Sequence, residues 1–339
     1  MTDRERERYS RQILFAPLGE AGQRRLLRGH AVVVGCGALG SFQAAALARA
    51  GVGALTLIDR DYVEESNLQR QWLYTEADAD EGAPKAVAAA RAIQAFNSHI
   101  EVRSIVADLR ADNIADAVSG AHVILDGSDN FETRYLINDY AVREGVPWIY
   151  GGAVSSHGVV MPILPGESAC LACVFPNPPA AGAPTCDTAG VLGSATAAVA
   201  SFQVAEALKV LAGRPEHVEK RLLSLDVWQG APRTISTSQP NTECRACGRR
   251  EFPHLEVTAR RPASLCGRNA VQVHDADAVD LDRLSETLSP LGEVRANEYA
   301  VRFRMPPYEM TVFADGRAII KGTDDIGVAR GLYARYVGA

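Results

Sequence analysis

The sequence carries one dense cluster of carboxylate, amide and cationic side chains. Asp59 opens it, Ser66, Asn67 and Arg70 follow, and Lys85 comes shortly after. Such cations, together with a metal ion, can offset the negative charge that spreads over a triphosphate during phosphoryl or nucleotidyl transfer. An NAD-dependent oxidoreductase needs no such cluster beside the carboxylate that holds its ribose. The cluster therefore favours a nucleoside triphosphate over a dinucleotide as the ligand.

A glycine-rich turn precedes this cluster. An apolar run leads into Gly35-Cys36-Gly37-Ala38-Leu39-Gly40, a helix of small residues follows, and a second apolar run ends at Asp59. Glycines without Cβ atoms let backbone N–H groups and a helix N-terminus approach a phosphate, and a carboxylate at the end of the second strand can accept from ribose hydroxyls. This order predicts a nucleotide-binding βαβ unit over 30–71. The alternative is a glycine turn that only packs a helix on a sheet.

Polar residues also follow a later apolar strand expected at 122–125. Asp126, Ser128, Asp129 and Asn130 come directly after it, at the end of a parallel strand where ligands bind in such sheets. Asp129 has the chemistry to bind a Mg²⁺ ion that bridges phosphates. Its alternative role is to cap the following helix, although Asn130 or Thr133 could serve as that cap.

Four of the seven cysteines form two Cys-x-x-Cys pairs, Cys170 with Cys173 and Cys244 with Cys247. Two such pairs supply the four thiolates of a tetrahedral structural Zn²⁺ site. Their long separation weakens an argument from spacing alone, and redox dithiols are the alternative. A zinc site would tie the segment after the sheet to a later part of the chain, without a vacant position for catalysis.

Another cysteine, Cys186, follows a proline-rich stretch at 176–184 that we expect to form a surface crossing loop. Cys186 comes before a helix expected at about 191–211, and a thiol at a helix N-terminus has its thiolate stabilised. Cys186 is therefore a candidate nucleophile. Cys36 and Cys266 are expected to be small buried residues.

The surrounding pattern predicts an α/β protein of two domains. Alternating strands and helices indicate a doubly wound, Rossmann-like, mainly parallel sheet that continues into antiparallel strands, within an ATP-binding domain at 1–248. Residues 249–339 predict a small α+β domain, for which we expect a docking or stabilising role. The expected helices are 4–28, broken near Pro17, and 85–97, 113–118, 191–211, 281–291 and 325–336, and the expected strands include 31–34, 101–106, 148–150, 159–164, 270–273, 294–303, 309–313 and 317–321.

Composition limits the function classes further. The net charge of −6 argues against sequence-independent nucleic-acid binding, which requires a basic surface. The charged N-terminus lacks the apolar region of a signal peptide, and the uncharged stretch 189–202 is followed by Glu206 and Lys209. We therefore expect a cytoplasmic protein that neither enters a membrane nor binds nucleic acid.

The sequence resembles the ThiF/MoeB family of adenylyltransferases, bacterial relatives of the ubiquitin-activating enzymes. The matching stretches are YSRQ (9–12), GCGALG (35–40), DRDYVEESNLQRQ (59–71), PKA (84–86), GSDNFETR (127–134), TCDTAG (185–190) and the two Cys-x-x-Cys pairs. They cover residues 9 to 247 and occur in the family's order.

The resemblance implies ATP-dependent adenylation of the C-terminal glycine of a ubiquitin-like sulfur-carrier protein of the ThiS or MoaD type, for thiamin thiazole, molybdopterin or a related product. It implies ATP, Mg²⁺ and Zn²⁺ as cofactors, a carrier ending in Gly-Gly and a sulfur donor such as a cysteine desulfurase as partners, and a homodimer in which Arg11 reaches the partner subunit's ATP. In ThiF-like members a cysteine in the region of Cys186 forms a covalent link with the carrier, whereas in MoeB-like members it is dispensable. Two alternatives are a tRNA-modifying member of the superfamily and a non-catalytic carrier-binding scaffold.

Overall fold

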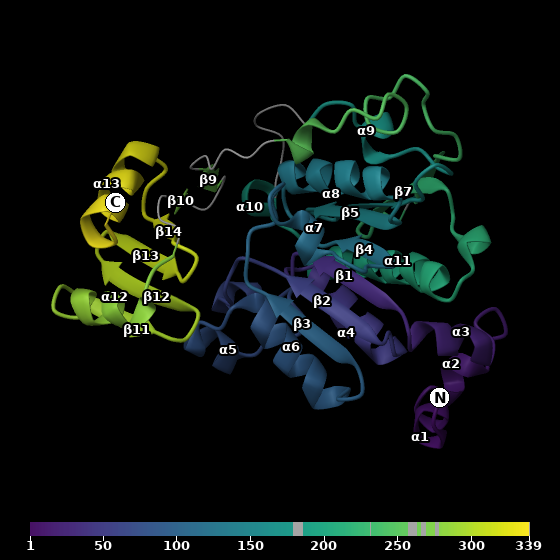
Figure 1. Cartoon of the computed structure of the whole chain (residues 1–339), viewed down its shortest axis with the longest axis horizontal. Helices are drawn as coiled ribbons and strands as arrows, with labels where there is room; N and C mark the ends of the chain where they lie inside the picture. Colours follow the sequence, from purple (N-terminus) through teal and green to yellow (C-terminus); the bar gives the residue numbers. More distant parts are fainter. Residues whose placement is uncertain (179–185, 231, 257–262, 266–268, 275–277, 339) are drawn as a thin grey trace. The chain divides into compact units, whose positions relative to one another are not determined.

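The computed structural model describes residues 1–178, 186–230, 232–256, 263–265, 269–274 and 278–338. The chain divides into two compact units, Met1–Val257 and Thr258–Ala339, where we expected a division after Gly248. Each unit has its own sheet (Figure 1), and each buries its own apolar side chains.

The N-terminal unit is built on an eight-stranded sheet with the order β3-β2-β1-β4-β5-β6-β7-β8. Its strands are β1 (His30–Val34), β2 (Ala54–Ile58), β3 (Glu101–Ile105), β4 (Val123–Asp126), β5 (Trp148–Val154), β6 (His157–Ile163), β7 (Arg221–Asp226) and β8 (Arg233–Ser236). Neighbours from β3 to β5 are parallel, and neighbours from β5 to β8 are antiparallel. The predicted parallel sheet that continues into antiparallel strands is confirmed.

Helices cover both faces of this sheet (Figure 1). On one face, α4 (Gly40–Ala50), α6 (Lys85–Phe96) and α11 (Gly193–Leu211) bury Leu47, Ile93 and Val199 in one core. On the other face, α7 (Ile114–Ala117) and α8 (Phe131–Glu144) contribute to a second core around Trp148. Strands β1 and β4 lie side by side within the sheet and not at its edges, which explains the apolar runs at 31–34 and 123–125.

Shorter elements complete the unit. They are α1 (Asp3–Arg8), α2 (Ser10–Ile13), α3 (Gly19–Leu26), α5 (Glu76–Glu81), α9 (Leu171–Val174), α10 (Cys186–Ala189) and the 3₁₀ turns η1 (Glu65–Asn67), η2 (Pro215–His217) and η3 (Pro253–Leu255). The helix expected at 4–28 is thus three helices. Tyr9, between α1 and α2, is buried, and its ring fills the space beside Gly51, which ends α4 in a left-handed conformation.

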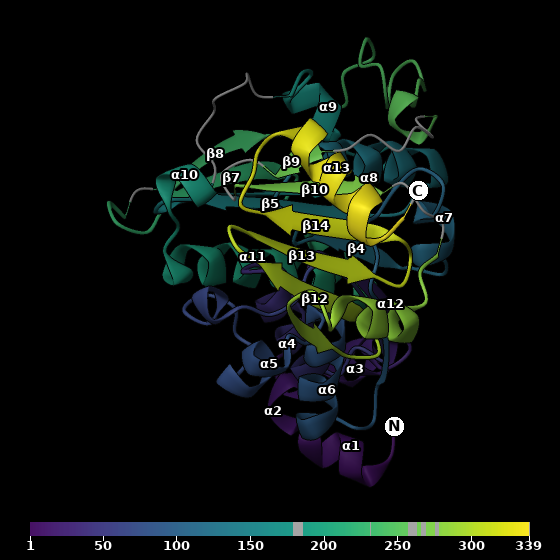
Figure 2. The ribbon, with the colours of Figure 1, turned by 90° about the vertical axis from the view of Figure 1, so that its left-hand side faces the viewer.

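The C-terminal unit has a six-stranded antiparallel sheet with the order β11-β12-β13-β14-β10-β9 (Figure 2). Its elements are β9 (Ala263–Leu265), β10 (Ala270–His274), α12 (Leu281–Leu288), β11 (Glu293–Ala296), β12 (Ala300–Met305), β13 (Tyr308–Phe313), β14 (Arg317–Lys321) and α13 (Ile326–Tyr336). Apolar residues of one sheet face, among them Phe303 and Ile320, pack with Leu288 of α12 and Tyr333 of α13. Within the described ranges, no helix combines the length and the apolar character needed to cross a membrane.

Candidate active site

The glycine turn connects β1 to α4, and its three glycines have different tasks. Gly35 has a φ of +86°, and a Cβ there would lie 2.6 Å from the carbonyl oxygen of Gly127. A Cβ at Gly40 would overlap the carbonyl oxygen of Gly35. At Gly37, by contrast, the one described neighbour within 4 Å of a Cβ position is Nε2 of Gln71, at 4.0 Å. Gly35 and Gly40 therefore permit the turn to fold, whereas Gly37, followed by Ala38, leaves backbone open to a ligand.

Asp59 follows β2 and holds this turn in place. Its Oδ2 accepts from the Cys36 N–H at 2.6 Å, and its Oδ1 accepts from the Asp61 N–H at 2.7 Å. Burial raises the pKa of Asp59, and the nearby Lys85 ammonium partly counters that rise. The Cys36 thiol is fully buried, which confirms the prediction of a small buried residue, and burial raises its pKa well above the usual value.

Lys85 begins α6 and lies beside the turn. Only 5% of the residue is exposed, and its Nζ pairs with Oδ2 of Asp61 at 3.2 Å. The Tyr74 hydroxyl group is within hydrogen-bond distance of two carbonyl oxygens, those of Cys36 at 2.6 Å and Lys85 at 3.2 Å. The structure thus brings Asp59, Lys85 and the glycine turn together.

The segment between β2 and α6 carries the remaining residues of the cluster. Asn67 is buried, and its Oδ1 accepts from the Glu64 N–H at 3.2 Å. Arg70 lies on the same segment, and its Nη1 donates to the carbonyl oxygen of Ser66 at 2.9 Å. Its guanidinium therefore lies against the segment that carries it, at the Ser66 carbonyl.

Asp129 is exposed in the loop between β4 and α8, and it is not the helix cap. Asn130 is the cap, because its side-chain oxygen accepts from the Thr133 N–H at 2.8 Å. Burial opposes the charge on Arg60, but Asp108, Asp61 and Asp129 together raise its pKa. Asp129 thus lies near Arg60 with its carboxylate open to solvent.

A buried ion pair fixes this loop, and the sequence pattern did not identify it. Arg134 Nε lies 3.0 Å from Oδ2 of Asp126, and both side chains are almost fully buried. Arg134 Nη2 also donates to the carbonyl oxygens of Ser128 at 2.9 Å and Gly151 at 3.2 Å. Burial raises the pKa of Asp126 although the Arg134 charge lowers it. One guanidinium therefore connects the end of β4, the loop that carries Asp129, and β5.

Arg11 is exposed and lies apart from the other site residues of its own chain. The neighbouring Gln12 donates from Nε2 to the carbonyl oxygen of Ala50 at 2.8 Å, at the last residue of α4. The glycine turn lies at the first residue of α4, and a helix of 11 residues is about 16 Å long. Arg11 is thus beside the wrong end of α4 to serve the site within its own chain.

The two Cys-x-x-Cys pairs come together. Sγ–Sγ distances are 3.8 Å for Cys170 and Cys173, 3.7 Å for Cys170 and Cys244, and 3.2 Å for Cys173 and Cys247. All four sulfur atoms lie within 4.8 Å of one another. Zn–S bonds of about 2.3 Å in a tetrahedron place sulfur atoms about 3.8 Å apart, whereas a disulfide requires about 2.05 Å. The four thiols therefore fit a tetrahedral metal ion and not two disulfides.

The placement of Cys186 corrects one argument from the sequence. Cys186 begins α10, a separate helix of four residues, and not the long helix α11, which begins at Gly193. Its Sγ donates to the carbonyl oxygen of Ala153 at 3.0 Å. A single helical turn has little macrodipole, so the long helix does not activate this thiol. Most of the expected crossing loop at 176–184 lies outside the described residues. Cys266 lies outside them as well.

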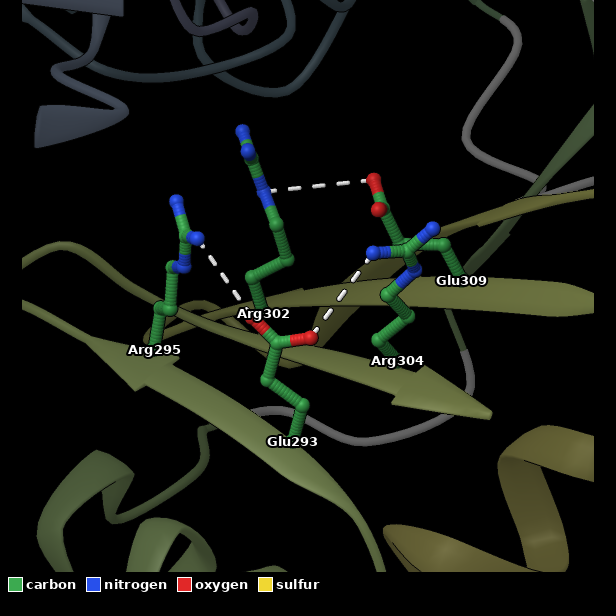
Figure 3. A pocket seen from close by; sticks show the side chains of 5 residues that line it. All are labelled: Glu293, Arg295, Arg302, Arg304 and Glu309. Atoms are coloured by element: carbon green, nitrogen blue, oxygen red, sulfur yellow. Dashed lines mark ion pairs between the residues drawn. The ribbon is translucent and has the colours of Figure 1, made fainter. Parts of the chain in front are cut away.

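The C-terminal unit carries a charged hollow on its sheet (Figure 3). Three arginines line it together with two glutamates: Arg295, Arg302, Arg304, Glu293 and Glu309. Glu293 pairs with Arg295 at 3.4 Å and Arg304 at 3.7 Å, and Glu309 pairs with Arg302 at 3.9 Å. The charges largely compensate one another, which is typical of a solvated sheet face.

Comparisons with known proteins agree with this architecture. A model of the ThiF family matches residues 9–246. The chain is 45% identical over 336 residues to the sulfur carrier protein ThiS adenylyltransferase of Bacillus subtilis, covering 98% of this chain and 99% of that protein. It is 41% identical over 253 residues to the sulfur carrier protein adenylyltransferase of Thermus thermophilus, covering 73% of this chain and 92% of that protein. Among solved structures, E. coli MccB with ATP has a similar fold, with a TM-score of 0.61 and 23% identity over 71% of this chain and 74% of that one.

Proposed function

Because the chain belongs to the ThiF family, we propose that it catalyses the ATP-dependent adenylation of the C-terminal glycine of a ubiquitin-like sulfur-carrier protein. The products are an acyl-adenylate on the carrier and pyrophosphate. The activated carrier then receives sulfur for thiamin thiazole, molybdopterin or a related product.

The observation that carries this proposal is the position of Lys85 beside the glycine turn. The buried Lys85 carries its charge near the carboxylate of Asp59, and its backbone lies beside the turn, since the Tyr74 hydroxyl is within hydrogen-bond distance of the carbonyl oxygens of both Cys36 and Lys85. ATP whose ribose binds at Asp59 would have its α-phosphate near Gly37 and its remaining phosphates near Lys85. A cation is required there, because negative charge moves onto pyrophosphate as it leaves.

The reaction requires no general base. The carrier's carboxylate is already ionised at neutral pH, so one of its oxygens can attack the α-phosphorus directly. The bond from that phosphorus to the β-phosphate oxygen breaks, and pyrophosphate departs with its electron pair. What the protein must supply is in-line positioning and charge neutralisation. Asn67 can help with positioning, Lys85 can supply both, and Arg70 can do so once its guanidinium leaves the carbonyl oxygen of Ser66.

The donor sets fit the two expected metal ions. Asp129 offers an exposed carboxylate at the end of β4, and Mg²⁺ commonly binds one or two carboxylates together with substrate phosphates and water. Bound there, Mg²⁺ would offset phosphate charge. Asn130 could assist only by donating a hydrogen bond from its amide –NH₂ group to a phosphate, since its oxygen caps α8. The four cysteines would hold a structural Zn²⁺, for which a reducing compartment such as the cytoplasm keeps thiols available.

We also propose that the active form is a homodimer. Arg11 lies at the end of α4 remote from its own glycine turn, so it could contact phosphates only in another subunit. Exposed Leu14 and Phe15 follow it, at 72% and 62% exposure, and apolar side chains of this size are suited to a subunit contact.

Carrier-dependent exchange between ATP and pyrophosphate tests the proposed reaction. Lys85→Ala and Arg70→Ala should each lower the exchange rate by roughly 100-fold or more, since each removes a cation from the triphosphate. Lys220→Ala is the matched control and should leave exchange unchanged, because the Lys220 side chain pairs with Glu167 at the surface of the described structure and belongs to none of the site segments. Melting temperature and size-exclusion elution establish that each variant is folded.

Near-normal exchange in both site variants would contradict the mechanism. Exchange should be measured with a panel of purified ThiS-type and MoaD-type carriers, because the carrier that supports it identifies the pathway. A wild-type protein that binds ATP but exchanges with none of them would favour a scaffold or another carboxylate substrate.

A further inference from the structure

Gln71 ends the motif at 59–71, but neither the motif nor the reaction has given its side chain a role so far. It is 4% exposed, and its Oε1 is buried without a hydrogen-bond partner in the described part of the chain. A buried amide oxygen without a donor destabilises the folded protein. A functional role for the –NH₂ group of the same amide would explain why this unfavourable arrangement is present.

Nε2 of Gln71 faces the open backbone at Gly37. It is the one described neighbour within 4 Å of the position that a Cβ at Gly37 would take, and it stands 4.0 Å away. The Cβ positions at Gly35 and Gly40 are blocked by backbone atoms, so Gly37 is the point of the turn that a ligand can approach. The amide –NH₂ group therefore borders the space above Gly37.

The backbone around Gln71 is held in place on both sides. The Gln71 N–H donates to the carbonyl oxygen of Asn67 at 3.0 Å, and the Trp72 N–H donates to Oγ of Ser41, in the first turn of α4, at 3.0 Å. On the other side, a Cβ at Gly193 would lie 3.1 Å from the carbonyl oxygen of Gln69, so the segment passes directly along the start of α11. Gln71 is thus held between two helix N-termini.

We propose that Nε2 of Gln71 donates a hydrogen bond to the α-phosphate of ATP and to the acyl-adenylate formed from it. This inference rests on the proposed adenylation. The Asp59 carboxylate accepts from the Cys36 N–H, so a ribose bound at Asp59 lies one residue from Gly37. The α-phosphate is the phosphate attached to that ribose, and a donor at Gly37 meets it first.

A neutral amide suits this position better than another cation would. Lys85 neutralises charge at the turn, while an amide donor can follow the α-phosphate from the ground state to the crowded transition state without repelling either Lys85 or Mg²⁺. Hydrogen bonds to charged groups are stronger than neutral ones, so binding of the phosphate offsets the unpartnered Oε1.

Gln71→Met separates this role from a structural one. Methionine has nearly the same length, removes the unpartnered oxygen and removes the donor. The variant should melt at or above the wild-type temperature, yet lose roughly 10- to 100-fold in kcat/KM for ATP during exchange. Gln71→Glu should lose more, because a carboxylate repels the phosphate.

Gln43→Met is the matched control for stability. Gln43 also has a buried Oε1 without a hydrogen-bond partner among the described residues, but its Nε2 donates to the carbonyl oxygen of Asp126 at 2.9 Å and to Oε1 of Gln203 at 2.6 Å. Its replacement should lower the melting temperature, in contrast to Gln71→Met.

Two results would overturn the assignment of Gln71. One is kcat/KM for ATP within threefold of wild type in Gln71→Met, and the other is a melting temperature that falls as far as in Gln43→Met. Equilibrium binding of ATP alone, without a carrier, distinguishes this inference from the reaction itself. If wild type binds ATP but exchanges with no carrier, the adenylation proposal fails, while weaker ATP binding by Gln71→Met still supports the contact.

Discussion

Replacing Arg134 by methionine should destabilise the N-terminal unit more than any exposed arginine replacement. The change leaves the fully buried Asp126 carboxylate without its cation, and it frees the carbonyl oxygens of Ser128 and Gly151. Removing one partner of a buried ion pair costs about 3–5 kcal/mol. A unit of this size loses about 2–4 °C in melting temperature per kcal/mol, so the expected decrease is roughly 6–20 °C.

The cost of this replacement should depend on pH. Burial already raises the pKa of Asp126, and loss of the Arg134 charge raises it further. A carboxyl group whose folded pKa lies above its unfolded pKa stabilises the protein below the unfolded value, and that stability is lost as pH rises through the folded pKa. In Arg134→Met the folded pKa of Asp126 is higher than in wild type, so this stability continues to fall over a pH range where wild type has already lost it. The difference in unfolding free energy between wild type and Arg134→Met should therefore be larger at pH 8 than at pH 5.5.

Denaturant unfolding at both pH values measures this effect. Arg143→Met is the control on the same helix, since Arg143 forms an exposed pair with Glu144 and should cost less than about 1 kcal/mol. The double variant Asp126→Asn with Arg134→Met should recover part of the loss and remove its pH dependence. An equal cost at both pH values, or a cost no larger than that of Arg143→Met, would refute the reasoning.

Two further predictions concern the cysteines. The purified protein should contain about one zinc ion per chain by atomic absorption. Cys173→Ser should lose the metal and melt several degrees lower, whereas Cys186→Ser should keep the metal. A wild-type protein that is stable without metal would exclude the zinc site. If Cys186 forms a covalent link with the carrier, mass spectrometry of enzyme, carrier, ATP and a sulfur source without reductant should detect an adduct that Cys186→Ser lacks. Full sulfur transfer by Cys186→Ser with no adduct in wild type would make the thiol incidental.

Regular periodicity and turn chemistry predicted most of the fold. At Asp315-Gly316, between β13 and β14, an Asp-Gly pair separates two apolar runs, which is typical of a hairpin turn, and Gly316 adopts a positive φ of +80° that glycine favours. Strand β7 was missed, because Arg221–Asp226 lacks the strict alternation of a half-buried strand. The short helix α10 was missed, because a helix of four residues that ends before Gly190, where φ is +71°, is too short to show a helical period.

The site was only partly visible in the sequence. Motif order indicated Asp59, Lys85 and the glycines, and these do lie together in the structure. Arg134 and Gln71 were missed, because a charged or amide residue in a polar stretch is usually solvated, and only coordinates reveal that both are buried. Both residues belong to recognised motifs, Gln71 to the stretch 59–71 and Arg134 to the stretch 127–134, but the motifs alone do not indicate what either side chain does.

The wide spacing of the cysteine pairs has a consequence for biosynthesis. Cys170 and Cys244 are 74 positions apart, and a ribosome adds about 5–20 residues per second, so the first two thiols wait roughly 4–15 s for the second pair to be synthesised. During that interval the nascent chain has two closely spaced thiols and an incomplete ligand set. Oxidation or capture of another metal can compete with zinc in that period, so the yield of correctly loaded protein should depend on the zinc and thiol-reductant supply of the cell while translation is under way.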